Sequence, residues 1–325
     1  MINSCFCMSC ALAVIISSWL WIPLIIITSP IWVLSMLIVY STLKFFGFWG
    51  KVLRVQYEVY EWLMFRSNKP RRYLWRKFYN SINWQFPSDE LQNMNLGYAC
   101  FTESGKTLEL SGDLENERFS YQLYDFLFTG FVEKKGKFIL ADIGCGRGAG
   151  LKFLHRKYHF DKSVGVDFSR RNIQFCKKHN GLPGIQFMFG DAEKLPLDDN
   201  SVDIILCVES SHCFGNLKGV LKEISRVLKP KGVFLLADFV GNADKEEYEE
   251  EFKGFLRLES RKDISENVLT ALKLDTQRRV DLIEKKVPFL LQRLMMRVAG
   301  VEGSTIYNQL EAGDTIYVAY YFTKE

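Results

Sequence analysis

Five short apolar runs alternate with helical stretches between residues 138 and 237, and this alternation constrains the fold more than any other feature. The predicted strands are Phe138–Ala141, Ser163–Val166, Ile185–Phe189, Ile204–Val208 and Val233–Ala237, and the predicted helices lie at about 117–132, 148–159, 169–179 and 216–228. Strands that alternate with helices are typical of an α/β fold with a doubly wound, mostly parallel sheet and helices on both faces. Ligands bind such sheets beyond the carboxyl ends of the strands, so functional residues are expected directly after each strand.

A glycine-rich run from Asp142 to Gly150 follows the first predicted strand. Gly144 and Gly146 allow a tight turn there and let a ligand approach the backbone closely at a helix N-terminus. A loop of this kind alone would serve a nicotinamide cofactor equally well. Asp142 distinguishes a nicotinamide cofactor from a cofactor that contains an amino acid. A carboxylate at this position would repel the pyrophosphate of the first and attract the ammonium of the second.

Carboxylates also follow the second and third predicted strands. Asp167 ends the second strand, where an acid can accept hydrogen bonds from both hydroxyls of a ribose. Asp191 follows the third strand, where it could hold the amino group of an adenine. Each acid taken singly could instead cap a helix or lie in a solvated turn. Three acids in register after three successive strands favour a cofactor that contains adenosine.

Residues from about Phe138 to Phe239, which carry these features, resemble the class I S-adenosylmethionine-dependent methyltransferases. The resemblance is closest to the branch that contains the ubiquinone, sterol, tocopherol and natural-product O-methyltransferases. It rests on five ordered motifs: DIGCGRG, VGVDFS, FGDAEKLPL, DNSVDIILCVESSHCF and ISRVLKPKGVFLLADF. The tail, in which GVEGSTIY begins at Gly300, resembles that of lipid-type members such as the mycobacterial phthiotriol methyltransferases.

The resemblance implies a Rossmann-like fold and S-adenosylmethionine as the cofactor. In the family the first acid contacts the methionine part of the cofactor, the glycines pass beneath it, the second acid holds the ribose, and an Asp-Ala pair flanks the adenine. Residues Asn93 to Tyr98 resemble an aromatic element that covers the cofactor in lipid-acting members. The residues assigned to the cofactor in this way are Tyr98, Asp142, Gly144, Cys145, Gly146, Asp167, Phe168, Asp191, Ala192 and Val208.

Methyl transfer from a sulfonium is an in-line displacement, so the enzyme chiefly aligns the acceptor and excludes water. A hydroxyl acceptor must also lose its proton, and histidine is a suitable base at neutral pH. Glu209 and His212 follow the fourth predicted strand, and Asp238 ends the fifth. This pattern resembles the natural-product sugar O-methyltransferases, in which such a His is the base and such an Asp assists it. Sterol C-methyltransferases place a Glu and a His in the same region, so the acceptor atom stays open, and His212 could instead cap the next helix. No metal site is expected.

Residues 1–43 contain no Asp, Glu, Lys, Arg or His. The apolar run at 11–28 would reach about 27 Å as a helix, close to the hydrocarbon thickness of a bilayer. Pro23 and Pro30 are natural breaks, so the segment predicts either one tilted span with an interfacial extension or a helical hairpin. A cleaved signal peptide is disfavoured, because the segment lacks a basic start and a small-residue cleavage site. We therefore expect a membrane anchor over residues 1–50.

The next segment, residues 51–90, is basic and aromatic, and we expect it to be juxtamembrane. Nine Lys and Arg residues lie between 44 and 77 against two Glu residues, which by the positive-inside rule places the following domain on the cytosolic side. The aromatic side chains suit the headgroup region of an anionic leaflet. They equally suit an amphipathic helix that packs on the domain. The sequence shows no other targeting motif, so the endoplasmic reticulum is the expected membrane.

The remaining residues, 91–325, are expected to form one methyltransferase domain. Its core spans about 117–240, and residues 241–325 supply a helical cap and a C-terminal strand at 315–322, with the order of the last strands left open. The apolar positions of residues 280–298 could line an acceptor pocket or pack on the sheet.

These features predict a methyltransferase that acts on a lipid or other apolar acceptor, by O-methylation, at the cytosolic face of a membrane. The alternatives are a non-catalytic cofactor-binding scaffold and a nicotinamide-dependent reductase. A net charge of +4 is too small to indicate nucleic acid as a partner. The sequence leaves the oligomeric state open.

Overall fold

The computed structural model describes residues 36–42, 59, 69–102, 104–130 and 137–325. The chain divides into two units, Met1–Ser67 and Asn68–Glu325. In the first unit, residues 36–42 form a short helix with exposed side chains. Among the described residues no helix is long and apolar enough to cross a membrane, and the predicted anchor over residues 1–50 lies mostly outside the described part of the chain.

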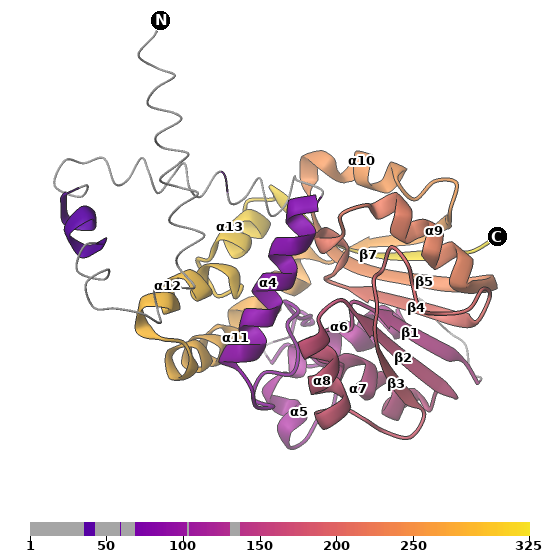
Figure 1. The fold of residues 1–325 in the computed structure, drawn as a ribbon, viewed down its shortest axis with the longest axis horizontal. Coiled ribbons are helices and arrows are strands. Elements are labelled where there is room, and N and C mark those ends of the chain that lie inside the picture. The colour runs from indigo at the N-terminus through magenta and orange to yellow at the C-terminus, as the bar shows by residue number, and fades with distance from the viewer. Residues whose placement is uncertain (1–35, 43–58, 60–68, 103, 131–136) are drawn as a thin grey trace, which may run out of the picture. The chain divides into compact units, whose positions relative to one another are not determined.

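A seven-stranded sheet with the order β3-β2-β1-β4-β5-β7-β6 organises the second unit (Figure 1). Its strands are β1 (Ile139–Ile143), β2 (Lys162–Asp167), β3 (Ile185–Phe189), β4 (Val202–Val208), β5 (Leu228–Gly241), β6 (Arg257–Asp263) and β7 (Thr315–Thr323). The five strands from β3 to β5 pair in parallel, whereas β7 pairs antiparallel with β5 and β6. The predicted mostly parallel sheet is therefore confirmed, and the carboxyl ends of its parallel strands share one edge.

Helices cover both faces of the sheet. In the described chain they are α4 (Lys69–Gln85), α5 (Asp113–Asn116), α6 (Arg118–Thr129), α7 (Ala149–Tyr158), α8 (Arg170–His179), α9 (Leu217–Val227), α10 (Lys245–Glu250), α11 (Ser265–Lys286), α12 (Phe289–Val298) and α13 (Thr305–Glu311). Successive residues of β5 point to opposite faces. Leu235 packs in the cluster with residues of α6, α7, α8, α11 and α13, and Leu236 packs in the cluster with residues of α9.

The region expected to be a helical cap, residues 242–299, also contains a strand, and that part of the prediction is wrong. Residues Arg257–Asp263 form β6 at the edge of the sheet, where all seven side chains are exposed. Because β6 buries neither face, its sequence RLESRKD lacks the apolar alternation that marks a strand. The long helical pattern also breaks at Val287 and Pro288, so that α11 and α12 are separate helices.

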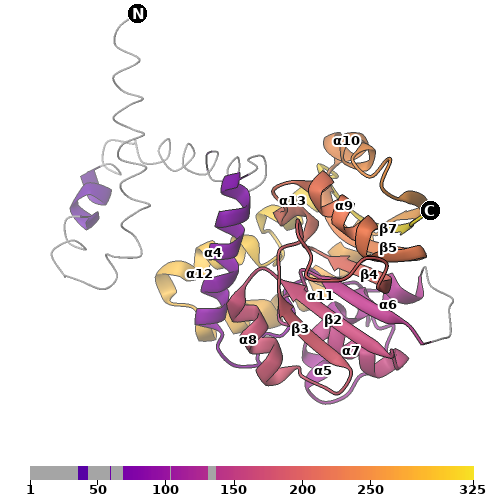
Figure 2. The same ribbon diagram turned by 45° about the vertical axis from the view of Figure 1, so that its right-hand side comes forward.

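Helix α4 belongs to the second unit, which begins at Asn68 rather than at residue 91. Ile82 of α4 and Phe86, the residue directly after the helix, pack against Ile283 and Val287 at the end of α11. Partly buried Met295 of α12 packs against the same cluster. Figures 1 and 2 both show α4 alongside α12 and α8. Of the two interpretations of the basic and aromatic segment, packing on the domain therefore holds for α4. Ile283, Val287 and Met295 pack with residues of α4, which neither interpretation of residues 280–298 predicted.

Candidate active site

The glycine-rich loop joins β1 to α7 and requires residues without a side chain. Gly144, Gly146 and Gly148 have φ of +78°, +53° and +79°, a region that L-residues with a side chain rarely adopt. A Cβ on Gly144 would lie 2.5 Å from both Cβ and Oγ of Ser210, which follows β4. The amide of Gly144 donates to the carbonyl of Val166 on β2 over 2.8 Å. The loop is thus held tightly against the neighbouring strand ends.

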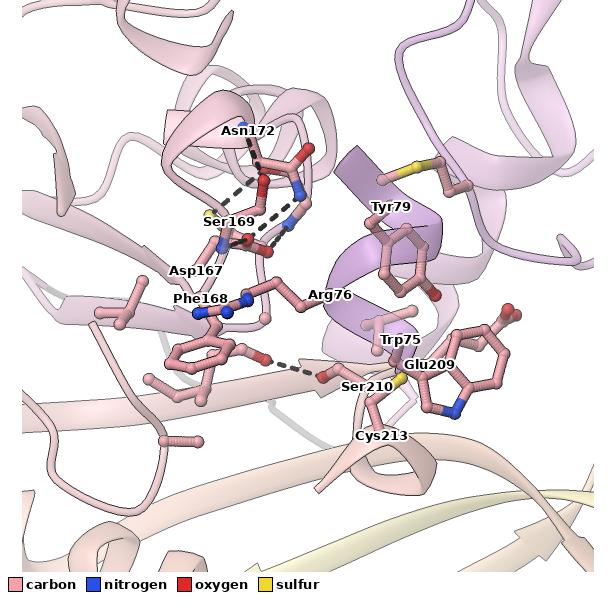
Figure 3. Close-up of a pocket in the computed structure, with 18 of the residues that line it drawn as sticks. Trp75, Arg76, Tyr79, Asp167, Phe168, Ser169, Asn172, Glu209, Ser210 and Cys213 are labelled. Atoms are coloured by element: carbon pink, nitrogen blue, oxygen red, sulfur yellow. Dashed lines mark hydrogen bonds between the residues drawn. The ribbon is translucent and has the colours of Figure 1, made fainter. Parts of the chain in front are cut away.

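A cavity with about 1030 Å³ of free space, including its opening to solvent, lies beyond the carboxyl ends of β1 to β4. Figure 3 shows its two sides, with Trp75 and Tyr79 of α4 on one and Asp167 and Phe168 on the other. The lining residues are Arg72, Trp75, Arg76, Tyr79, Gln92 to Asn95, Tyr124, Ile143 to Arg147, Val166 to Ser169, Asn172, Gly190 to Glu193, Val208 to Ser210 and Cys213 to Gly215. The mixture of aromatic and polar side chains in this lining suits a small-molecule ligand.

Asp142 is fully buried at the end of β1. The hydroxyl of Tyr124 donates to its Oδ2 over 3.2 Å, while Oδ1 has no hydrogen-bond partner among the described residues. Burial is the main cause that raises the pKa of Asp142 to about 7. Asn95, which lines the cavity, likewise has a buried Oδ1 without a partner in the described chain. Two acceptors without donors are costly in a folded protein and indicate that a ligand supplies the donors.

Asp167 lines the cavity at the end of β2 and binds the glycine loop. Its Oδ2 accepts from the amide of Gly146 over 3.0 Å, and its Oδ1 accepts from the amide of Ser169 and the side-chain amide of Asn172 over 2.7 and 3.1 Å. Burial raises the pKa of Asp167 to about 6, against these hydrogen bonds, which lower it. A carboxylate has about four acceptor positions, so one remains for a ligand hydroxyl.

Asp191 and Ala192 follow β3, and two arginines of α4 reach this part of the cavity. Arg72 forms an ion pair with Asp191, and its guanidinium lies 4.5 Å from the ring centre of Phe168. Arg76 also reaches over this ring, at 5.1 Å, as Figure 3 shows. The two guanidiniums and the ring therefore form one part of the cavity wall next to Asp191.

Glu209 lines the cavity directly after β4 in a strained backbone conformation, with φ of +47°. Such a conformation costs about 1–3 kcal/mol and persists only where the surroundings enforce it. The amide of Leu96 and the hydroxyl of Tyr317 donate to its Oε1 over 2.6 and 2.8 Å. Burial is the main cause that raises the pKa of Glu209 to about 7. A carboxyl group with this pKa can take up a proton at neutral pH.

His212 lies in the 3₁₀ turn Ser211–Cys213 after β4, where Asp238 of β5 holds it. Its Nδ1 is 2.8 Å from Oδ1 of Asp238, and its ring lies between Phe239 and Trp75, with ring centres 4.5 and 5.0 Å away. The neighbours Trp75 and Cys213 line the cavity, whereas His212 and Asp238 are not among its lining residues. The imidazole is thus oriented and lies immediately behind the wall of the cavity.

Three comparisons with known proteins bear on what binds here. Residues 141–236 match the family model described as a methyltransferase domain. The chain is 33% identical over 260 residues to the phthiotriol/phenolphthiotriol dimycocerosates methyltransferase of Mycobacterium tuberculosis, with 80% of this chain and 95% of that protein covered. The chain belongs to the class I S-adenosylmethionine-dependent methyltransferases. Its cofactor is S-adenosylmethionine, as predicted.

A second sequence relative and two solved structures are also similar to this methyltransferase. The fatty-acid O-methyltransferase of Mycolicibacterium smegmatis is 29% identical, with 76% of this chain and 88% of that protein covered. The geranyl diphosphate C-methyltransferase of Streptomyces coelicolor matches with a TM-score of 0.55 at 17% identity, covering 76% of this chain and 98% of that one. The [4+2]-cyclase SpnF matches with a TM-score of 0.60 at 17% identity, covering 79% of this chain and 96% of that one. At such identities the two solved structures show the fold alone.

The residues around the cavity fit S-adenosylmethionine. The acceptors of Asp142 and Asn95 that lack donors suit the ammonium of its methionine part. A Cβ on Gly146 would lie 3.1 Å from the methyl carbon of Met94 across the loop. A residue with a side chain would therefore narrow the space in which a ligand can approach the glycine loop. Asp167 and Asp191 lie at the ends of β2 and β3, where a nucleoside would extend.

The structure brings most of the predicted site residues of the methyltransferase to one cavity, but not all. The predicted residues that line it are Gly144, Cys145, Gly146, Asp167, Phe168, Asp191, Ala192, Val208 and Glu209. Asp142 lies buried next to the lining residue Ile143, and its bond from Tyr124 links it to the cavity wall. Tyr98 does not line the cavity, because its ring stacks on Phe126 at 4.3 Å. Residues Gln92 to Asn95 of the same element line the cavity instead.

Sequence reasoning missed the contribution of α4 to this site. Arg72, Trp75, Arg76 and Tyr79 all line the cavity, although they lie far upstream of the first of the five motifs. The spacing of the four residues, at i, i+3, i+4 and i+7, places them on one face of a helix. That spacing could have indicated a buried face, but it does not tell which surface the face covers.

Proposed function

We propose that this methyltransferase transfers the methyl group of S-adenosylmethionine to a hydroxyl group of a lipid at the cytosolic face of a membrane. Two relatives support a lipid acceptor by their names, which refer to phthiotriol dimycocerosates and to fatty acids. The charge-free segment 1–43 and the basic residues after it support the membrane location.

The strand-end residues would hold the cofactor along the sheet edge. Asp142 and Asn95 would accept from the ammonium, Asp167 from a ribose hydroxyl, and Asp191 from the adenine amino group. The bound cofactor supplies a sulfonium methyl that is already activated for displacement. The protein therefore has to align the acceptor and exclude water, which contributes on the order of 7–11 kcal/mol to catalysis.

The O-methylation half of the proposal rests on one observation: a group that can act as the base for the acceptor hydroxyl lines the cavity. Glu209 lines the cavity, and burial raises its pKa to about 7, so its carboxylate can accept a proton at neutral pH. Both hydrogen bonds from Leu96 and Tyr317 reach Oε1, and neither uses Oε2. We assign Glu209 as the group that takes the acceptor proton.

His212 is the second candidate base. Its Nδ1 is bound by Asp238, which fixes the ring and leaves Nε2 as the nitrogen that can act on a proton. The ring reaches the cavity only past Trp75 or Cys213, so a small displacement of one of these side chains would be needed. A substitution of each residue separates the two assignments, because only the base limits the rate at low pH.

Trp75 and Tyr79 support an apolar acceptor. Their rings lie stacked with centres 5.7 Å apart on α4, and both line the cavity. Aromatic walls bind apolar groups through buried area and leave the polar group to be held by a few side chains. A lipid hydroxyl next to an apolar chain matches this lining.

The direct test uses membranes that carry the full-length chain, methyl-labelled S-adenosylmethionine and a total lipid extract, and counts label in the organic phase. Asp142→Ala should abolish labelling, and Asp161→Ala, which removes an exposed carboxylate of the same kind, should not. Mass spectrometry of the labelled product would identify the acceptor atom. Equal labelling by the wild type and Asp142→Ala, or a label found only in water-soluble products, would contradict the proposal.

A further inference from the structure

Arg147 lies in the middle of the glycine loop and is almost completely buried, with 1% of its surface exposed. Its guanidinium donates to the carbonyl oxygens of Phe86 and Leu91, in the chain that leaves α4. It also lies over the ring of Phe175 on α8, 4.2 Å from the ring centre. Burying an arginine is costly unless its donors are all used, so these bonds hold the guanidinium in one orientation.

The same guanidinium begins a chain of side-chain hydrogen bonds that crosses to the cofactor site. Its Nε and Nη2 donate to Oδ1 of Asn83 on α4, over 3.3 and 3.2 Å. The Nδ2 of Asn83 donates to Oδ1 of Asn172 on α8. The Nδ2 of Asn172 donates to Oδ1 of Asp167 over 3.1 Å. Arg147 and Asp167 are thus joined by two amides, one from α4 and one from α8.

Arg147 and the carbonyl oxygen of Tyr79 together set the direction of these hydrogen bonds, because the Nδ2 of Asn83 also donates to Tyr79 over 3.0 Å. A guanidinium has donors only, so it selects the oxygen of Asn83, and the amide nitrogen of Asn83 must then face Asn172. Asn172 in turn faces Asn83 with its oxygen and Asp167 with its nitrogen. Without the guanidinium the oxygen of Asn83 loses both of its donors, and only the carbonyl of Tyr79 still orients this amide. Turning both amides over then costs less, and the oxygen of Asn172 would face the carboxylate of Asp167. Two acceptors in contact repel each other, and Asn172 is only 2% exposed, so little water could relieve the repulsion.

We propose that Arg147 and Asn83 are positioning residues that keep the donor side of Asn172 on the carboxylate of Asp167, so that this carboxylate stays oriented toward the ribose of S-adenosylmethionine. This inference rests on the proposed role of Asp167 at the ribose. It also gives α4 a function in cofactor binding, because Asn83 lies on this helix, 89 residues before Asn172.

The role is tested by measuring how strongly the ribose hydroxyls contribute to binding. Isothermal titration calorimetry compares S-adenosylhomocysteine with its 2′,3′-dideoxy analogue on the full-length wild type in detergent and on Arg147→Met and Asn83→Ala. The wild type should bind the analogue about tenfold or more weakly, since hydrogen bonds to a charged group are worth at least this factor. In both variants the difference between the two ligands should shrink to about two- to threefold. Arg156→Met, an exposed arginine of α7, is the matched control and should keep the wild-type ratio.

The ratio of the two affinities distinguishes positioning from a structural role. If Arg147 and Asn83 only stabilise the fold, each variant weakens both ligands by the same factor and the ratio does not change, which would overturn the inference. Asn83→Ala leaves Arg147 its carbonyl partners, so it tests the same chain of bonds if Arg147→Met does not fold. A wild type that binds both ligands equally would show that Asp167 does not hold the ribose. A wild type that binds neither would contradict the cofactor assignment, so the two failures can be told apart.

Discussion

Nδ1 of His212 lies 2.8 Å from Oδ1 of Asp238, and only 9% of the His212 side chain and 3% of the Asp238 side chain are exposed. Burial lowers the pKa of His212, but the charge of Asp238, the neighbouring Cys213 and the hydrogen bonds to both together outweigh burial, and the pKa is well above its ordinary value. Burial raises the pKa of Asp238, but the charge of His212 and the hydrogen bonds from His212 and Ser211 together lower it below its ordinary value. The two residues therefore form an imidazolium–carboxylate pair in the free enzyme at neutral pH.

This ion pair predicts an alkaline pH dependence if His212 takes the acceptor proton. Only the neutral imidazole can accept, so kcat/KM should rise with pH through the raised pKa of His212. Asp238→Asn removes the charge that raises this pKa, so the midpoint should move to lower pH, and the plateau should fall by about a hundredfold as the ring loses its orientation. The measurement is the pH profile of kcat/KM for the wild type and the variant.

Glu209→Gln provides the comparison for that profile. If Glu209 is the base, this variant loses activity at every pH. Asp238→Asn then changes the midpoint of the profile little, because the charges of Asp238 and His212 act on the pKa of Glu209 in opposite directions. An unchanged midpoint in Asp238→Asn together with an inactive Glu209→Gln would exclude His212 as the base.

Asp142→Asn should raise the stability of the cofactor-free protein at pH 8 and weaken cofactor binding. The pKa of Asp142 is raised by burial from 3.8 to about 7, so the folded chain binds more protons than the unfolded chain between these values. Its contribution to stability is therefore present at low pH and is lost as the pH rises from about 4 to 7. Asn carries no charge and still contacts Tyr124. Thermal melts at pH 5 and pH 8 measure the first effect, and calorimetry with S-adenosylhomocysteine the second.

The melt at pH 5 is the control for the melt at pH 8. Asp142→Asn should melt above the wild type at pH 8, and the difference should shrink at pH 5, where Asp142 is protonated. Affinity for S-adenosylhomocysteine should fall at least tenfold, because the ammonium loses a charged partner. A variant that melts below the wild type at pH 8 would refute the assignment of Asp142 as an unpaired buried charge.

The strand-end acids could be predicted from the sequence because their positions follow from local patterns. A buried parallel strand is a short apolar run, and the residue after it lies at the sheet edge whatever the rest of the chain does. Asp142, Asp167 and Asp191 were located in this way. The ends of the predicted strands differ from the observed ones by a few residues, with β5 extending furthest beyond its apolar run.

The rest of the site could not be predicted because it depends on contacts between distant segments. Helix α4 has the composition of a membrane-surface helix, and only its contacts with Phe168 and Asp191 show that it closes the cofactor cavity. Tyr98 matches its motif, yet the position of Phe126 on α6 turns its ring away from the cavity. Strand β6 has no apolar alternation in its sequence, so it can be recognised only from its pairing with β7 in the structure.

Gly144→Ala should destabilise the protein by about 3 kcal/mol or more. Its φ of +78° strains any residue with a side chain, and the new Cβ would lie 2.5 Å from Cβ and Oγ of Ser210. Gly303→Ala is the matched control, because Gly303 has φ of +79° and a Cβ added to it would meet no atom within 4 Å. Its cost should be about 1–2 kcal/mol, from the backbone alone. Urea denaturation measures both, and equal losses would show that Ser210 moves aside without cost.

Deletion of residues 1–50 should separate membrane presentation from cofactor binding. The cut lies before α4, so every described residue of the cavity remains, and affinity for S-adenosylhomocysteine should stay within about twofold of the wild type. Turnover of an acceptor embedded in vesicles should fall by about tenfold or more, because a tethered enzyme meets its acceptor at a higher effective concentration. Turnover of the same acceptor in detergent micelles should change little.

A second truncation tests where the proposed anchor ends and the catalytic unit begins. Deletion of residues 1–85 also removes α4, and with it Arg72, Trp75 and Asn83. This variant should lose cofactor affinity together with turnover in vesicles and in micelles. If the deletion of residues 1–50 already lowers cofactor affinity as much as turnover, the first segment acts on the fold of the catalytic unit and the tethering hypothesis is refuted.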